Sequence, residues 1–191
     1  MGSPTASPRL HLRSLAALAA VCVTALAAAP SAMAATACES ANAIPSKSNE
    51  RTVVRATLCT INAHRERHGL RPLTLNKRLA KAARRHAGDM DRRNYFSHDS
   101  LGGGTFVDRI RLTGYLAGAS SWSVGENLAW ATRSNAAPGN ITQMWMASPG
   151  HRANILSPSF REIGIGVAYG APVAGGPKPA ATYATDFGLK S

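Results

Sequence analysis

The hydrophobic pattern of this chain changes its period near the C-terminus, and this change restricts the fold more than any other feature. Earlier in the chain apolar residues recur at helical spacing, and Val54, Leu58 and Ile61 predict a helix over residues 49–68. Later, "REIGIGVAYG" and "AATYATDFG" have strand-like patterns and are joined by the Pro/Gly-rich "APVAGGPKP", which predicts an antiparallel hairpin. We therefore expect an α+β fold with its sheet between helical layers, and no second domain.

A second helix is predicted to begin at Asn76, because the residues after it divide into an apolar face and a basic face. The apolar face comprises Leu79, Ala82, Ala83, His86 and Met90, and the basic face comprises Lys77, Arg78, Lys81, Arg84, Arg85 and Arg92. A histidine on an apolar face is more often a hydrogen-bonded core residue than a ligand. We expect His86 to be a core residue for that reason.

Three further helix starts are visible in the sequence. Thr105 and Asp108 form a capping box that opens a short helix, and another helix is expected from Pro138 to Met146. In "MWMASPGHRANIL", Ser148 is suited to cap a following helix that has Pro149 at its first position.

The first 34 residues have the pattern of a secretory signal peptide. Arg9 and Arg13 precede the apolar stretch "SLAALAAVCVTALAAAP", and "AMA" before residue 35 places small residues where a signal peptidase recognises them. We expect residues 1–34 to be removed by cleavage after Ala34. The alternatives are a membrane anchor, for which the run is shorter than the ~20 residues of a typical span, and a lipoprotein attached through Cys22. The mature form is expected to have no transmembrane segment.

Two cysteines remain after this cleavage, Cys38 and Cys59. An even pair in a secreted chain predicts a disulfide, which would contribute roughly 3 kcal/mol through the entropy of the loop it closes. This pairing disfavours a catalytic cysteine. The expected organisation is a segment over residues 35–48, tethered by the disulfide, and one domain over residues 49–191.

The chain is strongly basic, with a formal net charge of +12. Removing Arg9 and Arg13 leaves 20 basic against 10 acidic residues, a net charge of +10. Such a charge favours anionic cell-envelope polymers or lipid as partners, or it simply keeps the protein soluble. The basic residues are scattered and form no groove with interleaved aromatic residues, so we expect no nucleic acid partner.

Three residues are candidates for chemistry, although the familiar hydrolase motifs and a Cys-x-x-Cys ribbon are missing. Glu126 is the only acidic residue between Asp108 and Glu162, and its apolar neighbours predict that it needs a cation, backbone N–H groups or a metal as partner. His98 lies in a turn. His151 lies near a helix start, where the helix dipole favours the neutral imidazole that binds metals or accepts protons.

Four motifs together resemble one known family. "NYFSHDS", "GYLAGASSWSVGENLAW", "MWMASPGHRANILSPSFREIGIGVAYG" and "YATDFG" are similar to the bacterial branch of the CAP superfamily, also called the SCP/TAPS domain and named for cysteine-rich secretory proteins, antigen 5 and pathogenesis-related 1 proteins. The resemblance extends from about Leu58 to Gly188. It implies a single-domain α-β-α sandwich with a central antiparallel sheet, and a shallow cleft where two histidines and two glutamates can hold a divalent metal.

The resemblance assigns His98, Glu126 and His151 to that cleft as metal-site residues, and Glu126 as the candidate catalytic residue. Ser148 stands where many eukaryotic members have the second glutamate. Two neutral imidazoles with one carboxylate still suit Zn²⁺ with an open position for water, at lower affinity than a four-ligand site.

The resemblance leaves three functions open. We expect a secreted, non-catalytic binding module that holds a metal and meets an extracellular ligand or the cell envelope. The alternatives are a metal-dependent, peptidase-like hydrolase in which Glu126 orients or deprotonates water, and a lipid- or sterol-binding protein. Lipid binding would need an apolar groove, to which Trp122, Trp130 and Trp145 would contribute unless they are core residues. Asn140 begins a glycosylation sequon, Asn-Ile-Thr.

Overall fold

The computed structural model of the chain describes residues 1–2 and 38–191. The expected signal peptide and its cleavage site after Ala34 lie outside the described residues, except for the first two. In chain order the elements are η2 (Lys47–Asn49), α1 (Glu50–Arg67), β1 (Thr74–Leu75), α2 (Lys77–Arg93), α3 (Phe106–Leu112), β2 (Trp122–Thr132), η3 (Arg133–Ala136), α4 (Pro138–Ala147), α5 (Pro149–Ile155), β3 (Glu162–Ala168) and β4 (Ala180–Lys190).

The four strands form one sheet in the order β1-β3-β4-β2. Strand β4 is antiparallel to both of its neighbours, so the predicted β3–β4 hairpin is confirmed. The expected central antiparallel sheet is confirmed in β2, β4 and β3, and the two-residue β1 adds to β3 in parallel. Strand β2 was not predicted, because Gly125, Glu126 and Asn127 are all disfavoured in strands.

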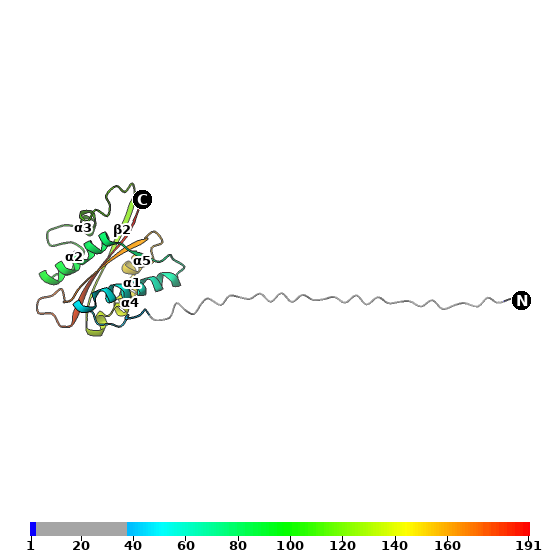
Figure 1. The fold of residues 1–191 in the computed structure, drawn as a ribbon, viewed down its shortest axis with the longest axis horizontal. Coiled ribbons are helices and arrows are strands. Elements are labelled where there is room, and N and C mark those ends of the chain that lie inside the picture. Colours follow the sequence, from blue (N-terminus) through cyan, green and yellow to red (C-terminus); the bar gives the residue numbers. More distant parts are fainter. Residues whose placement is uncertain (3–37) are drawn as a thin grey trace. The chain divides into compact units, whose positions relative to one another are not determined.

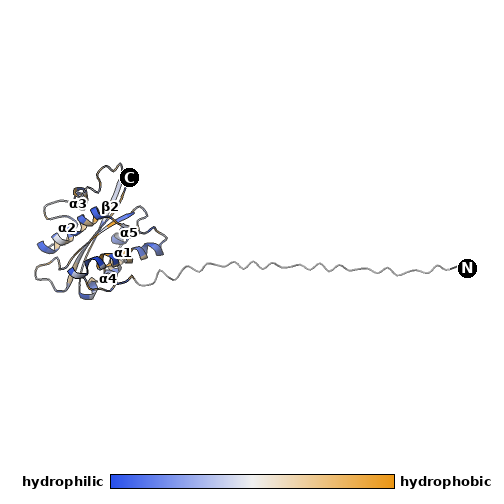
Figure 2. Cartoon of the chain, in the orientation of Figure 1, coloured by the Kyte–Doolittle hydropathy of each residue, from blue (hydrophilic) through white to orange (hydrophobic). Residues whose placement is uncertain are grey.

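Helices cover both faces of this sheet, as the expected α+β sandwich requires. Figure 1 shows α2 and α3 on one side of the strands and α1, α4 and α5 on the other. Hydrophilic residues occupy much of α1 and α2, whereas hydrophobic residues lie on the strands between the layers (Figure 2). The larger core cluster lies under α1, α4 and α5, where Trp145 meets Tyr183 edge-to-face at 6.3 Å.

Helix α2 packs unusually close to the sheet because two residues of β3 have no side chain. A Cβ atom at Gly164 would overlap the backbone at Leu79, and one at Gly166 would overlap the backbone at Ala83. The predicted apolar face of α2 is buried, His86 included. The basic face of α2 is exposed, as expected.

Side chains cap α2 and α3, whereas the predicted cap of α5 is not made. Asn76 accepts from the N–H groups of Arg78 and Leu79 at the start of α2, and Thr105 and Asp108 form the capping box of α3. Ser148 occupies the N-cap position of α5, but its side chain makes no capping hydrogen bond. The start of α5 therefore depends on Pro149 and on tertiary contacts.

The predicted disulfide between Cys38 and Cys59 is confirmed and ties the N-terminal segment to α1. None of the helices within the described part of the chain is both long and apolar enough to cross a membrane.

Candidate functional site

Glu126 is the centre of a buried polar cluster that joins three elements of the chain. Its Oε1 lies 2.8 Å from Nδ1 of His98, in the loop after α2, and its Oε2 accepts a 2.6 Å hydrogen bond from Nη2 of Arg109, on α3. The Glu126 side chain is only 1% exposed, whereas His98 is 53% exposed. The expectation that this carboxylate needs cationic partners is confirmed, and both of its oxygens are occupied.

The contact with Glu126 fixes which nitrogen of His98 is available. A carboxylate can only accept, so Nδ1 of His98 carries the proton, and in the neutral ring Nε2 keeps its lone pair. The hydrogen bond to Glu126 raises the pKa of His98 above its ordinary value, against the opposing effect of burial. This is the arrangement in which a buried carboxylate orients a metal-ligating histidine.

His86 holds the loop that carries His98. Its Nε2 lies 2.8 Å from the carbonyl oxygen of Ser97, the residue before His98, so Nε2 is the donor and Nδ1 carries no proton in the neutral ring. Burial lowers the pKa of His86, with a further lowering by the charge of Arg109. The prediction that His86 is a hydrogen-bonded core residue is confirmed. Its hydrogen bond to Ser97 positions the loop that carries His98.

Arg109 connects Glu126 to the same loop. Its Nη1 donates to Oγ of Ser100 at 3.1 Å and to the carbonyl oxygen of Gly104 at 3.4 Å, while Nη2 bonds Glu126. Sequence reasoning gave a cation as one of three possible kinds of partner for Glu126 but did not identify Arg109. With 22 basic residues in the chain, only the packing of α3 against β2 selects it.

Asp186 is the second residue of the cluster that sequence reasoning missed. It lies directly across from Glu126 in the β2–β4 pairing and is buried, and among the described residues neither of its carboxyl oxygens has a hydrogen-bond partner. Burial and the neighbouring charge of Glu126 raise its pKa well above its ordinary value. Burial and a neighbouring carboxylate both disfavour the charged form of Asp186.

His151 is brought beside this cluster because α5 is hydrogen-bonded to β2. The side-chain nitrogen of Asn154 donates to the Glu126 carbonyl oxygen at 3.1 Å and to Oδ1 of Asn127 at 2.8 Å. Nδ2 of Asn127 in turn donates to the His151 carbonyl oxygen at 3.0 Å. Burial, and then the charge of His98, lower the pKa of His151. His151 is thus the neutral imidazole that its position near a helix start predicts.

The far end of α5 is held by a buried cation. Nη1 of Arg65, on α1, donates to the carbonyl oxygens of Ile155 and Ser157 at 2.7 and 2.9 Å. Arg65 is fully buried, and burial lowers its pKa, followed by the charge of Arg161. Carbonyl oxygens at a helix C-terminus are the natural partners of such a cation, so Arg65 fixes the position of α5 and with it His151.

The side chains that the resemblance assigns to a metal are His98, Glu126 and His151. Within residues 38–191, no three side chains of His, Cys, Asp and Glu are arranged to hold one ion. Both oxygens of Glu126 are hydrogen-bonded, to His98 and to Arg109, and the contact with Nδ1 orients the His98 ring. His151 and Ser148 line the same pocket. Ligation by His98, Glu126 and His151 together stays a prediction.

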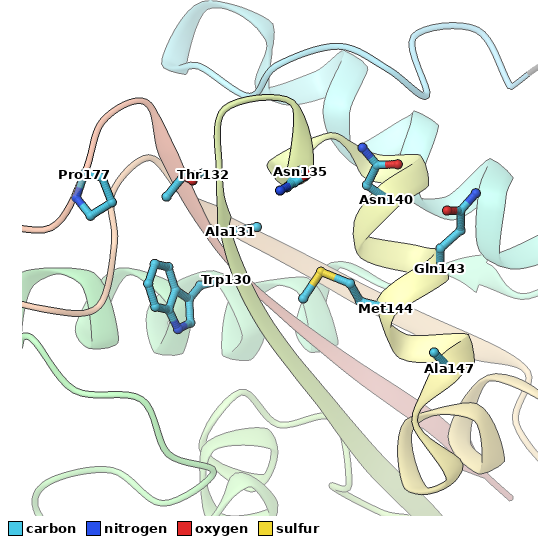
Figure 3. A pocket seen from close by; sticks show the side chains of 9 residues that line it. All are labelled: Trp130, Ala131, Thr132, Asn135, Asn140, Gln143, Met144, Ala147 and Pro177. Atoms are coloured by element: carbon cyan, nitrogen blue, oxygen red, sulfur yellow. The ribbon is translucent and has the colours of Figure 1, made fainter.

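Two adjoining pockets lie between β2 and α4. The smaller, of about 290 Å³, is lined by Phe96, Leu128, Ala129, Trp130, Met144, Trp145, Ser148 and His151. The larger, of about 740 Å³, shares Trp130 and Met144 with it and extends toward Asn140 and Pro177 (Figure 3). Of the three tryptophans, Trp145 is a core residue, Trp122 is exposed, and Trp130 lines both pockets.

The sequence profile of the family described as "CAP: Cysteine-rich secretory protein family" matches residues 58–175, more than half of the chain. The chain belongs to the CAP family. Two Bacillus subtilis proteins are similar in sequence: YkwD, 38% identical over 117 residues, and the membrane protein YlbC, 31% identical over 121 residues. The matched regions cover 61% and 63% of this chain but only 41% and 33% of those proteins, so the chain spans less than half of either relative.

Solved structures of other bacterial proteins share this fold. An extracellular Bacillus anthracis protein with an SCP domain is 30% identical, with a TM-score of 0.55 over 72% of this chain and 42% of that chain. An outer surface protein from Borrelia burgdorferi has a TM-score of 0.59 at 19% identity, covering 78% of this chain and 97% of that one. The α+β sandwich is therefore the CAP fold, and these two neighbours are extracellular or surface proteins.

Proposed function

We propose that this CAP domain is an extracellular binding module whose pocket at His98 and His151 takes a divalent metal, with Zn²⁺ the best fit. The observation that carries the proposal is the Arg109–Glu126–His98 arrangement, which holds a half-exposed imidazole with Nε2 free. A carboxylate behind a histidine in this way fixes its tautomer and raises its basicity toward a metal. Neutral His151 is the second ligand.

The location outside the cell rests on two supports. The first is the expected signal peptide over residues 1–34, and the second is that the 30% identical Bacillus anthracis protein with an SCP domain is extracellular. The disulfide between Cys38 and Cys59 fits the same compartment, because disulfides persist in oxidising surroundings.

The geometry favours binding over hydrolysis. A bound Zn²⁺ would offer a positive charge and an open coordination position to a ligand oxygen. A hydrolase would also need a general base within reach of the attacking water. Glu126, the only sequence candidate for that base, is 1% exposed, and both of its oxygens are occupied by His98 and Arg109. The pocket of about 290 Å³ is at the low end of the range for small-molecule sites, which does not favour a sterol.

The proposal is tested by titrating the metal-free protein with ZnCl₂ in a calorimeter at neutral pH. We expect His98→Gln and His151→Gln each to lower Zn²⁺ affinity by about tenfold or more, and the double variant to lose little beyond either single one, since both residues act on one ion. The matched control is His68→Gln, on an exposed histidine at the end of α1. Wild-type protein that does not bind Zn²⁺, or an equal loss in His68→Gln, would overturn the metal site.

A second variant separates binding from hydrolysis. Glu126→Gln keeps a side-chain oxygen for Nδ1 of His98 but removes the negative charge, so we expect weaker Zn²⁺ binding. We expect no peptide hydrolysis by the Zn²⁺-loaded wild type on a fluorogenic peptide library. Turnover in the wild type that Glu126→Gln abolishes while Zn²⁺ stays bound would contradict the binding module and establish the hydrolase.

A further inference from the structure

We propose that the groove shown in Figure 3 binds a neutral saccharide. This proposal is separate from the proposed metal site. The groove is not lined by His98 or His151, and saccharide binding there needs no ion. Its volume of about 740 Å³ is within the ~300–1,000 Å³ of small-molecule sites and suits a short oligosaccharide.

The lining of the groove is polar and uncharged. Three amide side chains and one hydroxyl contribute, and the full lining is Trp130, Ala131, Thr132, Asn135, Asn140, Gln143, Met144, Ala147 and Pro177. No charged side chain takes part, although the chain carries a net charge of +12. Amides both donate and accept hydrogen bonds, as sugar hydroxyls do. An anionic ligand would find no cation in this lining.

The groove also offers an apolar surface of the kind that a sugar ring needs. Figure 3 shows Trp130 and Pro177 on one side of the groove and Gln143 and Met144, from α4, on the other. A pyranose ring presents C–H groups on its face, and these pack on an indole while the hydroxyls at its edge reach polar partners. A purely apolar ligand would bury the amides without partners, which is costly.

The amides differ in how they are held. Nδ2 of Asn140 donates to the carbonyl oxygen of Ser134 at 2.8 Å, which orients the amide and leaves Oδ1 as an acceptor. Asn135 and Gln143 are exposed and form no hydrogen bond within the described residues, so their donors are available. A fixed acceptor beside adjustable donors suits recognition of hydroxyl groups.

This placement also accounts for the Asn-Ile-Thr motif at Asn140. The hydroxyl of Thr142 is buried and donates to the carbonyl oxygen of Pro138 at 2.9 Å, and Asn140 itself is bonded to Ser134 within the first turn of α4. Both side chains have structural partners and neither is presented as an extended acceptor. The structure favours Asn140 as a wall of the groove over a glycan attachment site.

The test uses chitotetraose, cellotetraose and maltotetraose as probes, with tetragalacturonate and tetra-alanine as comparison ligands. Each is titrated into ¹⁵N-labelled protein at millimolar concentration, and the shifts of the Trp130 indole N–H and the side-chain amides are followed. We expect at least one neutral saccharide to shift these signals. Tetragalacturonate and tetra-alanine are expected to leave them unchanged.

Variants then locate the contact. Among the described residues that line the groove, Trp130 supplies the only aromatic ring, so we expect Trp130→Ala to weaken saccharide binding by roughly two- to tenfold. Trp130→Phe keeps an aromatic ring and should retain part of the saccharide affinity. Gln143→Leu should weaken saccharide binding without affecting the fold. The control is Trp122→Ala, an exposed tryptophan that does not line the groove.

Three outcomes overturn the proposal: no saccharide shifts the groove signals, Trp122→Ala weakens binding as much as Trp130→Ala, or tetra-alanine or tetragalacturonate binds in place of the neutral sugars. The last would make the groove a peptide site or an anion site. We expect saccharide binding to persist in the double variant His98→Gln/His151→Gln, which would show that it does not depend on the metal. Failure of the saccharide proposal is therefore distinguishable from failure of the metal proposal.

Discussion

Replacing Arg109 by methionine tests whether the buried cluster depends on a balance of charges. Methionine keeps most of the side-chain volume and removes the cation that bonds Oε2 of Glu126 at 2.6 Å. The Arg109 side chain is 12% exposed and that of Glu126 is 1% exposed, so solvent cannot replace the lost partner. The remaining cationic partner of Glu126 would be His98, and only when His98 is protonated.

The expected cost follows from this burial. Removing one partner of a buried ion pair costs about 3–5 kcal/mol, a large share of the about 5–15 kcal/mol that stabilises a domain. The loss should be smaller below the raised pKa of His98, where a protonated imidazole compensates Glu126, and should grow as the pH rises through that pKa. Adding Glu126→Gln removes the unpaired charge, so the double variant should recover roughly 1–3 kcal/mol relative to Arg109→Met alone.

The assay is urea unfolding followed by tryptophan fluorescence, since Trp145 is buried, at pH 5.5 and pH 8. The matched control is Arg111→Met, two residues along α3, whose ion pair with Asp108 is exposed and should not measurably affect stability. Equal small losses in both variants, or strictly additive effects of Arg109→Met and Glu126→Gln, would refute the charge-balance reasoning.

Three other predictions address the fold and the histidines. Gly164→Ala should destabilise the domain by about 1–3 kcal/mol in the same urea assay, because its Cβ overlaps the α2 backbone, whereas Gly150→Ala, with no atom within 4 Å of the added Cβ, should not. Cys59→Ser should cost about 2–4 kcal/mol while leaving saccharide and Zn²⁺ titrations unchanged, and unchanged stability would contradict a stabilising disulfide. In NMR titrations of the metal-free protein, His98 should titrate above pH 6.5 and His151 below it. The reverse order would contradict the contact between His98 and Glu126.

The parts of the fold that the sequence predicts are those with a strong local pattern. Helix α2 follows from its apolar stripe and the Asn76 cap, and the β3–β4 hairpin follows from two strand-like runs around a Pro/Gly loop. Strand β2 breaks this rule, because its middle residues, Gly125 to Asn127, are poor strand formers. They are tolerated because β4 and α5 supply their partners.

The candidate site is only partly visible in the sequence for a related reason. His98, Glu126 and His151 are recognisable from motifs, but their roles depend on contacts made across the fold. Arg109 lies 17 positions before Glu126, and Asp186, although it is part of the "YATDFG" motif, lies on another strand. No local pattern shows that either residue is a partner of Glu126. Local patterns reveal which residues are unusual, whereas tertiary packing decides which of them face a ligand and which support the others.

The most direct test of the account is an anomalous difference map from crystals of the wild-type protein grown with ZnCl₂. We predict one strong peak bonded to Nε2 of His98 and to a ring nitrogen of His151 at the about 2.0–2.1 Å typical of Zn–N bonds. Glu126 should remain hydrogen-bonded to Nδ1 of His98 and to Arg109. A map with no peak at this pair, or with the ion bonded directly to Glu126 and His98 turned away, would contradict the account.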